Sequence, residues 1–213
     1  LLLSNLFVMF ALRRIISLHS NLHIKKKFFD AGFWIACATF FYFWAFLFFA
    51  LVIVALIYHS QNNIKNLLIP FVGIATFIML LVTYNILVHD AYFTPSNFKR
   101  FASLDFTLYN SKADILRLTI VFTSYLWTMV YFFKTLSDKN KNLRPSYYLI
   151  AWASLLALLV AVIAPVKNGS EFIFLFAPFS IILGNYLEVI PERWFKEVFP
   201  VLFVLVPIVS LFL

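Results

Sequence analysis

Long apolar runs recur along the whole chain, and they restrict its fold more than any other feature. Runs of 16 to 31 residues with few charges alternate with short polar segments. Runs of about 20 apolar residues are typical of helices that cross a bilayer. Only 12% of the residues are charged, against about 25% in soluble domains, so a water-soluble fold would lack polar cover. The sequence predicts an all-α, polytopic transmembrane helix bundle.

The second apolar run is too long for one upright crossing. Its 31 residues would form a helix of about 46 Å, whereas the hydrocarbon core is about 30 Å thick. It is either one strongly tilted helix or two short helices that meet near Tyr42 and Phe43. We therefore expect about seven or eight membrane segments, some of them short or broken. The apolar runs are 1–12 (partial), 28–58, 67–88, 115–133, 147–164, 172–188 and 198–213.

The basic residues favour the two-helix alternative and set an orientation. The net charge of +8 arises from Lys and Arg in short loops between apolar runs, which fits the positive-inside pattern of membrane proteins and not a nucleic-acid binder. If 28–58 crosses twice, both strongly basic segments, 13–27 and 134–146, share the cytoplasmic face. The segments 89–114 and 165–171 then face the other side.

The chain reads as a single transmembrane domain over residues 1–213, which we expect to be a fragment of a longer chain because both ends lie within apolar sequence. Ala153, Ala157 and Ala161 recur every four residues, and small residues at that spacing allow another helix to approach closely. Pro191 and Pro200 are placed to open and close a short helix on the membrane surface.

No motif assigns a reaction. The chain has no phosphate-binding glycine loop, no H-E-x-x-H and no Cys-x-x-Cys, so we predict no cofactor. No metal site is predicted either: His19 and His23 would share a helix face, but no third ligand is in view. Their basic neighbours make contact with anionic lipid the better interpretation.

Polar residues at membrane depth are costly and are therefore candidates for function. Glu171, Pro178 and Asn185 are spaced by seven, so they share one helical face, with Glu188 close to it. Pro178 would also kink the helix and leave a carbonyl to be satisfied by a neighbour. This stripe either lines a ligand site through Glu171, Asn185 and Glu188 or only bonds a neighbouring helix.

A second polar set opens the next apolar run. Arg117 follows Asp114 by three residues, so the two can pair across one helical turn at the membrane edge. Ser124 and Thr128 continue the same face inward. Such a pair at the start of a helix is more often structural than catalytic.

The longest loop holds the remaining candidates, which are His89, Asp90, Lys99, Arg100 and Asp105. Long loops in compact domains are usually functional or disordered, and the aromatic content of this one argues against disorder. The His–Asp pair and the second aspartate are candidates for a general base or a divalent-cation site. The Lys–Arg pair is a candidate for binding phosphate. The alternative is a capped loop that lies on the membrane surface.

Three stretches carry a family resemblance: ALRRIISL from Ala11, RPSYYLIAW from Arg144, and GSEFIFLFAPFSIILGNYLEVIPERWFKE from Gly169. Together they resemble an uncharacterised multi-pass inner-membrane family of the Bacteroidota, which implies a bacterial cytoplasmic membrane and no established activity. More loosely, the short broken helices and large outer loop resemble multi-pass glycosyltransferases that use polyprenyl-phosphate sugars. Those enzymes usually carry a key acidic residue in their first external loop. That region is missing here or lies before Leu1, so the catalytic part of the resemblance is carried onto no residue.

The absent motifs, the alanine stripe and 28 phenylalanines favour a non-catalytic subunit that packs against other membrane proteins. Its expected partners are membrane lipids and other membrane protein subunits. The alternative is an enzyme acting on a polyprenyl-phosphate lipid, with an outer-face cavity near Asp90 or Asp105 and Lys99 or Arg100. A secondary transporter is a third hypothesis, because such proteins use discontinuous helices.

Overall fold

The computed structural model describes residues 1–59, 64–90, 92 and 102–209. Within these ranges the chain is helical and contains no strand. The α-helices are α1 (Leu2–Ile16), α2 (Ile24–Phe41), α3 (Phe49–His59), α4 (Ile64–His89), α5 (Lys112–Thr135), α6 (Arg144–Ile163), α7 (Ile173–Val189) and α8 (Arg193–Val209). Short 3₁₀ helices join several of them: η1 (Ser17–Ser20), η2 (Phe43–Phe48), η3 (Thr107–Tyr109), η4 (Leu136–Asp138) and η5 (Ser170–Phe172).

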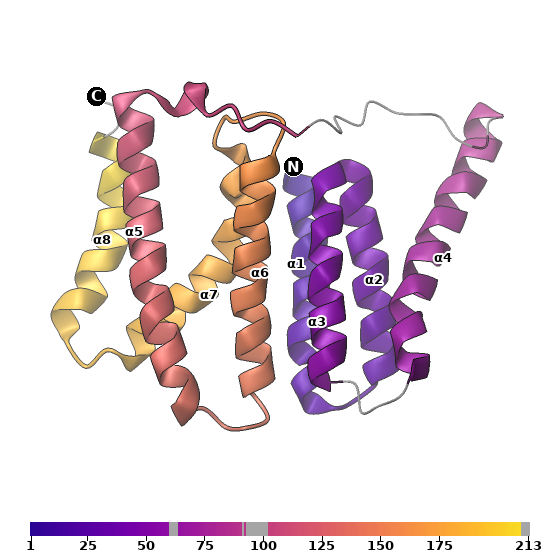
Figure 1. Cartoon of the computed structure of the whole chain (residues 1–213), viewed down its shortest axis with the longest axis horizontal. Coiled ribbons are helices and arrows are strands. Elements are labelled where there is room, and N and C mark those ends of the chain that lie inside the picture. The colour runs from indigo at the N-terminus through magenta and orange to yellow at the C-terminus, as the bar shows by residue number, and fades with distance from the viewer. Residues whose placement is uncertain (60–63, 91, 93–101, 210–213) are drawn as a thin grey trace.

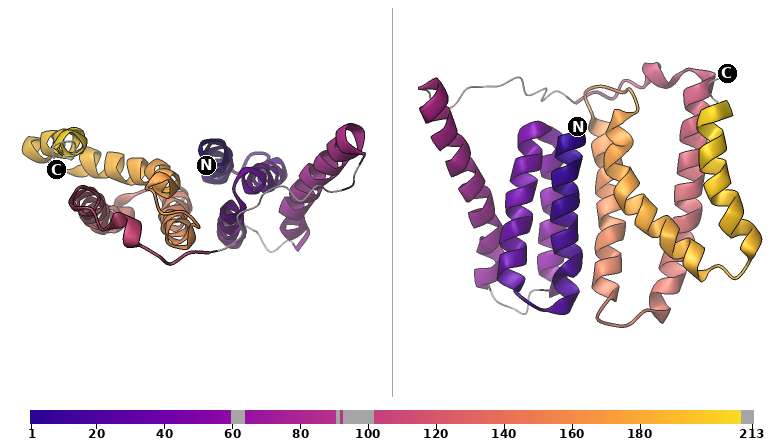
Figure 2. Two further views of the ribbon diagram at one scale, coloured as in Figure 1. Left: turned by 90° about the horizontal axis from the view of Figure 1, so that it is seen from above. Right: turned by 180° about the vertical axis from the view of Figure 1, so that it is seen from behind.

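Successive helices run in alternating directions between the two ends of the bundle (Figure 1). One end holds η1, η4 and the α7–α8 connection, and the other holds the α2–α3 turn, the 102–111 segment and the α6–α7 turn (Figure 2). Five of the described helices are long and apolar enough to cross a membrane. They are Leu2–Ser20, Asn66–His89, Lys112–Asp138, Arg144–Ile163 and Ser170–Val189. The chain is thus a membrane protein, and the count of seven or eight segments stays a prediction.

The long run 28–58 is broken at Tyr42 into two helical segments, α2 and η2–α3, so it is not one strongly tilted helix. Tyr42 has an extended backbone (φ −147°, ψ 110°) between α2 and η2. Its N–H donates to the Ala38 carbonyl and its own carbonyl accepts from the Ala45 N–H, both at 3.0 Å. Because any residue can adopt an extended conformation, the chain reverses here without glycine or proline.

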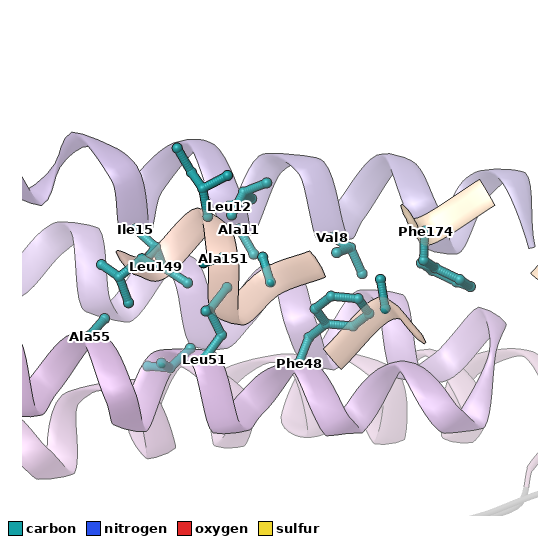
Figure 3. Packing of buried hydrophobic residues seen from close by; sticks show 14 of the residues in the cluster. Val8, Ala11, Leu12, Ile15, Phe48, Leu51, Ala55, Leu149, Ala151 and Phe174 are labelled. Atoms are coloured by element: carbon teal, nitrogen blue, oxygen red, sulfur yellow. The ribbon is translucent and has the colours of Figure 1, made fainter. Parts of the chain in front are cut away.

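The core runs between α1, α2, α3, α5, α6 and α7, and Figure 3 shows its part between α1, α3, α6 and α7. Val8, Leu51 and Phe174 come from three of these helices and are all buried. The alanine stripe of α6 is buried as well, with at most 4% of any of its three side chains exposed. The prediction that small residues bring helices close together is therefore confirmed, and the neighbours belong to this same chain.

Helix α4 lies at the edge and leans away from the bundle (Figure 1). It crosses α2 at two glycines. A Cβ on Gly32 would lie 2.3 Å from the Pro70 carbonyl oxygen, and one on Gly73 would lie 2.4 Å from the Phe29 carbonyl oxygen. The two backbones therefore touch, which glycine alone permits. Most of α4 is exposed, with only 11% of its apolar window buried.

The expected surface helix that closes at Pro200 is not present. Helix α8 continues from Arg193 to Val209. Aromatic contacts hold it to α7 on both sides of the proline: Phe199 lies 5.2 Å from Tyr186 and Phe203 lies 5.9 Å from Phe179, between ring centroids. This packing outweighs the proline's preference to end a helix.

Candidate functional site

Two connecting segments meet at one end of the bundle and bring polar side chains together. The Tyr109 hydroxyl donates to the Glu171 carboxylate and accepts from the Gly169 N–H at 2.9 Å. The Ser103 N–H also donates to the Ile163 carbonyl at 3.4 Å, at the end of α6. These contacts fasten the 102–111 segment to the α6–α7 turn, which Figure 2 shows at the same end of the molecule.

Local turns present these groups. Asp105 accepts a hydrogen bond from the Thr107 N–H at 3.0 Å, an Asx-type turn that begins η3 and positions Tyr109. Bonds from the Thr107 backbone and side chain hold the pKa of Asp105 below its usual value. Gly169 has φ +85°, a left-handed conformation that glycine adopts without strain, and it turns the chain into η5.

Glu171 is the most deeply placed carboxylate of this cluster, with 1% of the residue exposed. Its Oε1 accepts from Tyr109, whereas its Oε2 has no hydrogen-bond partner among the described residues. Burial and the bond to Glu171 raise the pKa of Tyr109. On the other side, burial and the charge of Glu171 raise the pKa of Tyr42, in the α2–α3 turn, to about 12. Two tyrosines therefore flank a buried carboxylate.

Lys167 is buried beside this carboxylate, with 2% of the residue exposed. Its ammonium donates to the Ala161 carbonyl at 2.7 Å and to the Val162 carbonyl. These carbonyls lie in the last turn of α6, where helices leave acceptors without partners and favour a positive charge. The ring of Phe106 covers the ammonium at 4.7 Å. Burial lowers the pKa of Lys167, and the charge of Glu171 opposes that shift.

A pocket of about 240 Å³ opens beside this cluster, between α5 and the α6–α7 turn. Its polar wall includes Asp114 and Arg117, whose carboxylate and guanidinium are 3.4 Å apart. Ser111 caps α5 by accepting from the Asp114 N–H at 3.1 Å, and this fixes the first turn of that helix. The apolar wall of the pocket is formed by Leu108, Leu118, Val121, Phe172 and Phe176.

The candidates from the long loop that the structure describes, His89, Asp90 and Asp105, do not line this pocket. His89 ends α4, where its ring lies 6.5 Å from the Tyr84 ring, and the following Asp90 is exposed with φ +49°. Asp105 is exposed and belongs to the turn before Tyr109. Lys99 and Arg100 lie outside the described residues. Among those described, no group of three or more His, Cys, Asp or Glu is placed to hold a metal.

The polar stripe of α7 is divided between the two ends of the bundle. Glu171 lies beside Tyr109, but Asn185 is fourteen residues further on, about 21 Å along a helix. The Asn185 side-chain oxygen accepts from the Thr135 hydroxyl at 3.4 Å. Glu188 is exposed, and Pro178 is buried against α1. Asn185 therefore bonds a neighbouring helix, which is the second of the two interpretations of the stripe.

Sequence reasoning missed Lys167 and gave Tyr109 no special role. Lys167 precedes Glu171 by four residues in a short turn, and that proximity of opposite charges was the available signal. Tyr109 is 62 residues away from Glu171. Nothing in the local sequence distinguishes it from the other aromatic residues of the loop.

A second, larger cavity of about 460 Å³ lies between α2, η2, α3 and α4. It is lined almost entirely by apolar side chains, of which Phe40, Phe43, Phe46, Phe49, Phe71 and Phe77 are the largest. Thr39 is its hydroxyl-bearing residue, and that hydroxyl donates to the Ile35 carbonyl at 2.8 Å within α2. We call this cavity the α2–α4 groove. Its lining has no group suited to acid–base or nucleophilic chemistry.

Comparison with known proteins identifies one family. The sequence matches, over residues 1–213, the family described as "Family of unknown function (DUF6427)". No curated protein and no solved structure matches the chain.

Proposed function

Because this chain belongs to the DUF6427 family, whose function is unknown, we propose its function from its own structure: it is a non-catalytic subunit that packs against another membrane protein. The observation that carries the proposal is the α2–α4 groove. It is a concave apolar site at the depth of the membrane helices, with six phenylalanines in its wall. Its proposed occupant is an apolar helix of the partner protein.

Exposure of α4 alone does not support a partner, because lipid tails cover a convex apolar helix as well as a protein does. A concave site differs, since van der Waals packing favours whatever fills it with closely fitting atoms. Helix α4 leans away from α2 above their crossing (Figure 1), and the groove is lined by residues of both helices. A helix seated there would pack against both helices at once.

The alanine stripe no longer contributes to this proposal. Ala153, Ala157 and Ala161 are buried against helices of the same chain, so they are not available to a partner. The groove replaces them as the supporting feature.

We also propose a bacterial cytoplasmic membrane, with the end that holds η1 and η4 in the cytosol. Lys25, Lys26, Lys139 and Lys141 lie in or beside the connections at that end, which agrees with the positive-inside rule. An impermeant amine reagent applied to intact cells should leave Lys139 and Lys141 unlabelled. Labelling of either would reverse the orientation.

Co-purification tests the subunit proposal directly. Ala36 lines the groove, whereas Ala75 lies on the exposed face of α4 and does not line it. The tagged protein, extracted in mild detergent from its native membrane, should bring down a membrane protein that Ala36→Trp loses at least tenfold and Ala75→Trp retains. A monodisperse preparation of this chain alone, or a partner retained by both variants, would refute the proposal.

A further inference from the structure

We propose that the pocket between α5 and the α6–α7 turn binds one phospholipid whose headgroup carries both a phosphate and an ammonium, as phosphoethanolamine does. The first part of an acyl chain would lie between α5 and α7. This site is separate from the α2–α4 groove and independent of the subunit proposal.

The wall of the pocket changes from charged to apolar along α5. Asp114, Arg117, Leu118 and Val121 all line it, at the i, i+3, i+4 and i+7 positions that share one helix face. From the first to the last the wall descends about 10 Å into the membrane-spanning helix. An amphiphile with a charged head and an apolar chain changes from charged to apolar in the same order.

The opposite wall continues this gradient. Phe172 and Phe176 follow each other by four residues and face the apolar part of α5. Asn168 and the Gly169 turn lie at the polar mouth. The volume of about 240 Å³ is below the range of about 300–1,000 Å³ for pockets that enclose a whole drug-sized ligand. The pocket therefore fits a headgroup and the start of one chain, with the remainder of the lipid in the bilayer.

The charges around the pocket select a zwitterion. Arg117 offers the planar, multiple N–H donors that suit phosphate oxygens, and Asp114 offers a carboxylate to an ammonium. The Asp114 carboxylate accepts from the Ser111 hydroxyl at 2.6 Å and pairs with Arg117 at 3.4 Å, so both charges are held at the pocket wall. Both side chains are partly exposed, at 45% and 34%.

Behind Asp114 and Arg117 lie two buried residues of opposite charge, Glu171 and Lys167. Lys167 lines the pocket, and Glu171 is held by Tyr109, which also lines it. A purely anionic headgroup would meet the Asp114 carboxylate with the buried Glu171 behind the wall, and a purely cationic one would meet Arg117 and Lys167. A headgroup that carries both signs avoids either repulsion.

Native mass spectrometry of the detergent-purified full chain tests this proposal with three probes. They are phosphatidylethanolamine, phosphatidylglycerol, which lacks the ammonium, and glycerophosphoethanolamine, which lacks the chains. We expect one phosphatidylethanolamine per protein, retained about tenfold more strongly than phosphatidylglycerol. Glycerophosphoethanolamine should bind at least about tenfold more weakly, because the apolar wall then contributes nothing.

Matched variants assign the two charges and the apolar wall. Asp114→Asn should abolish the preference between the two lipids, Arg117→Gln should weaken both, and Val121→Trp should block both while keeping every charge. Glu188→Gln, at the opposite end of α7, should bind like the wild type, and thermal unfolding should show that each variant is folded.

Three results would overturn the proposal. They are equal retention of the two lipids by the wild type, retention unchanged in Val121→Trp, and binding of the chain-free probe as strongly as the lipid. The last result would make the ligand a soluble phosphate compound. If Arg117→Gln does not fold, Val121→Trp and Asp114→Asn still decide the outcome.

Discussion

Helices α4 and α6 are both long and strongly apolar, yet they occupy opposite environments. About 50% of the apolar window of α6 is buried inside the protein, against 11% for α4. Hydrophobicity therefore predicts that each helix enters the bilayer but not what surrounds it there. In a bilayer, an apolar side chain gains no hydrophobic free energy by moving from lipid tails to protein. The difference in burial between α4 and α6 must therefore arise from the shapes of their side chains.

The side chains that α6 and α4 present to their neighbours differ in size. Helix α6 presents small residues to its neighbours: Ala153, Ser154 and Ala157 are each at most 1% exposed. Helix α4 has one such position at its crossing with α2, Gly73, and it carries large exposed side chains such as Leu80 and Leu87 elsewhere. A continuous small face yields a buried helix, and a single small residue yields a single crossing.

The largest effect should follow from removing that crossing. Gly73→Leu places a side chain against the α2 backbone, where even a Cβ would lie 2.4 Å from the Phe29 carbonyl oxygen. Backbone cannot move aside as a side chain can, so we expect destabilisation at or above ~3 kcal/mol, the upper end for overpacking. Thermal unfolding in detergent measures it.

Gly184→Leu is the matched control, because no heavy atom lies within 4 Å of a Cβ built there. It should unfold close to the wild-type temperature. Equal loss of stability in both variants would show that glycine itself, and not the crossing, matters in these helices.

A second test replaces a small residue by a large one on each of the two helices, α6 and α4. Ala157→Leu on α6 must push apart a fully buried contact and should cost ~1–3 kcal/mol. Ala75→Leu on the exposed face of α4 should change stability by less than ~0.5 kcal/mol. Urea or thermal unfolding of both variants in the same detergent measures the two losses of stability. Similar losses would contradict the contrast between a close-packed α6 and an exposed α4.

The sequence predicts the positions of these helices well and their partners poorly. Apolar runs 115–133 and 147–164 match α5 (Lys112–Thr135) and α6 (Arg144–Ile163) within a few residues, because hydropathy is a local property. The alanine spacing predicts a close-packed face for the same reason. The continuation of α8 through Pro200 depends on rings of α7, which no local pattern includes.

The candidate site shows the same limit. Asp114 and Arg117 are paired as their spacing predicts. The contact between Tyr109 and Glu171 joins positions 62 residues apart, and only the folded bundle brings them together. Lys167 lies in a short turn, where lysine is normally solvated. Its burial depends on the free carbonyls at the end of α6, whose position is a property of the structure.

A third test asks whether polar contacts also distinguish the two helices at their ends. The turn that follows α6 is fastened by Tyr109, whereas the end of α4 is followed by the exposed Asp90. Tyr109→Phe leaves Glu171 buried without its donor and should cost ~1–2 kcal/mol. Limited proteolysis should then cleave the 102–111 segment faster than in the wild type. Unchanged stability and cleavage would show that this contact holds nothing in place.

The smallest effect should be a pH dependence of the same contact. Burial and the bond to Glu171 raise the pKa of Tyr109 above its ordinary value of about 10. The folded state thus keeps a proton that the unfolded state releases, and stability falls as the pH rises above about 10. The difference in stability between wild type and Tyr109→Phe should shrink there by up to ~1 kcal/mol, and a difference that grows with pH would contradict the assignment.

The one-residue joint at Tyr42 bears on how the chain enters its membrane. Tyr42 bonds to α2 through the Ala38 carbonyl and to η2 through the Ala45 N–H, so the chain turns back within one extended residue. No loop separates α2 from η2, which leads directly into α3. We therefore expect α2 and the η2–α3 segment to enter the membrane together as a helical hairpin. A translocation machinery that releases helices one at a time would have to hold α2 until α3 has left the ribosome.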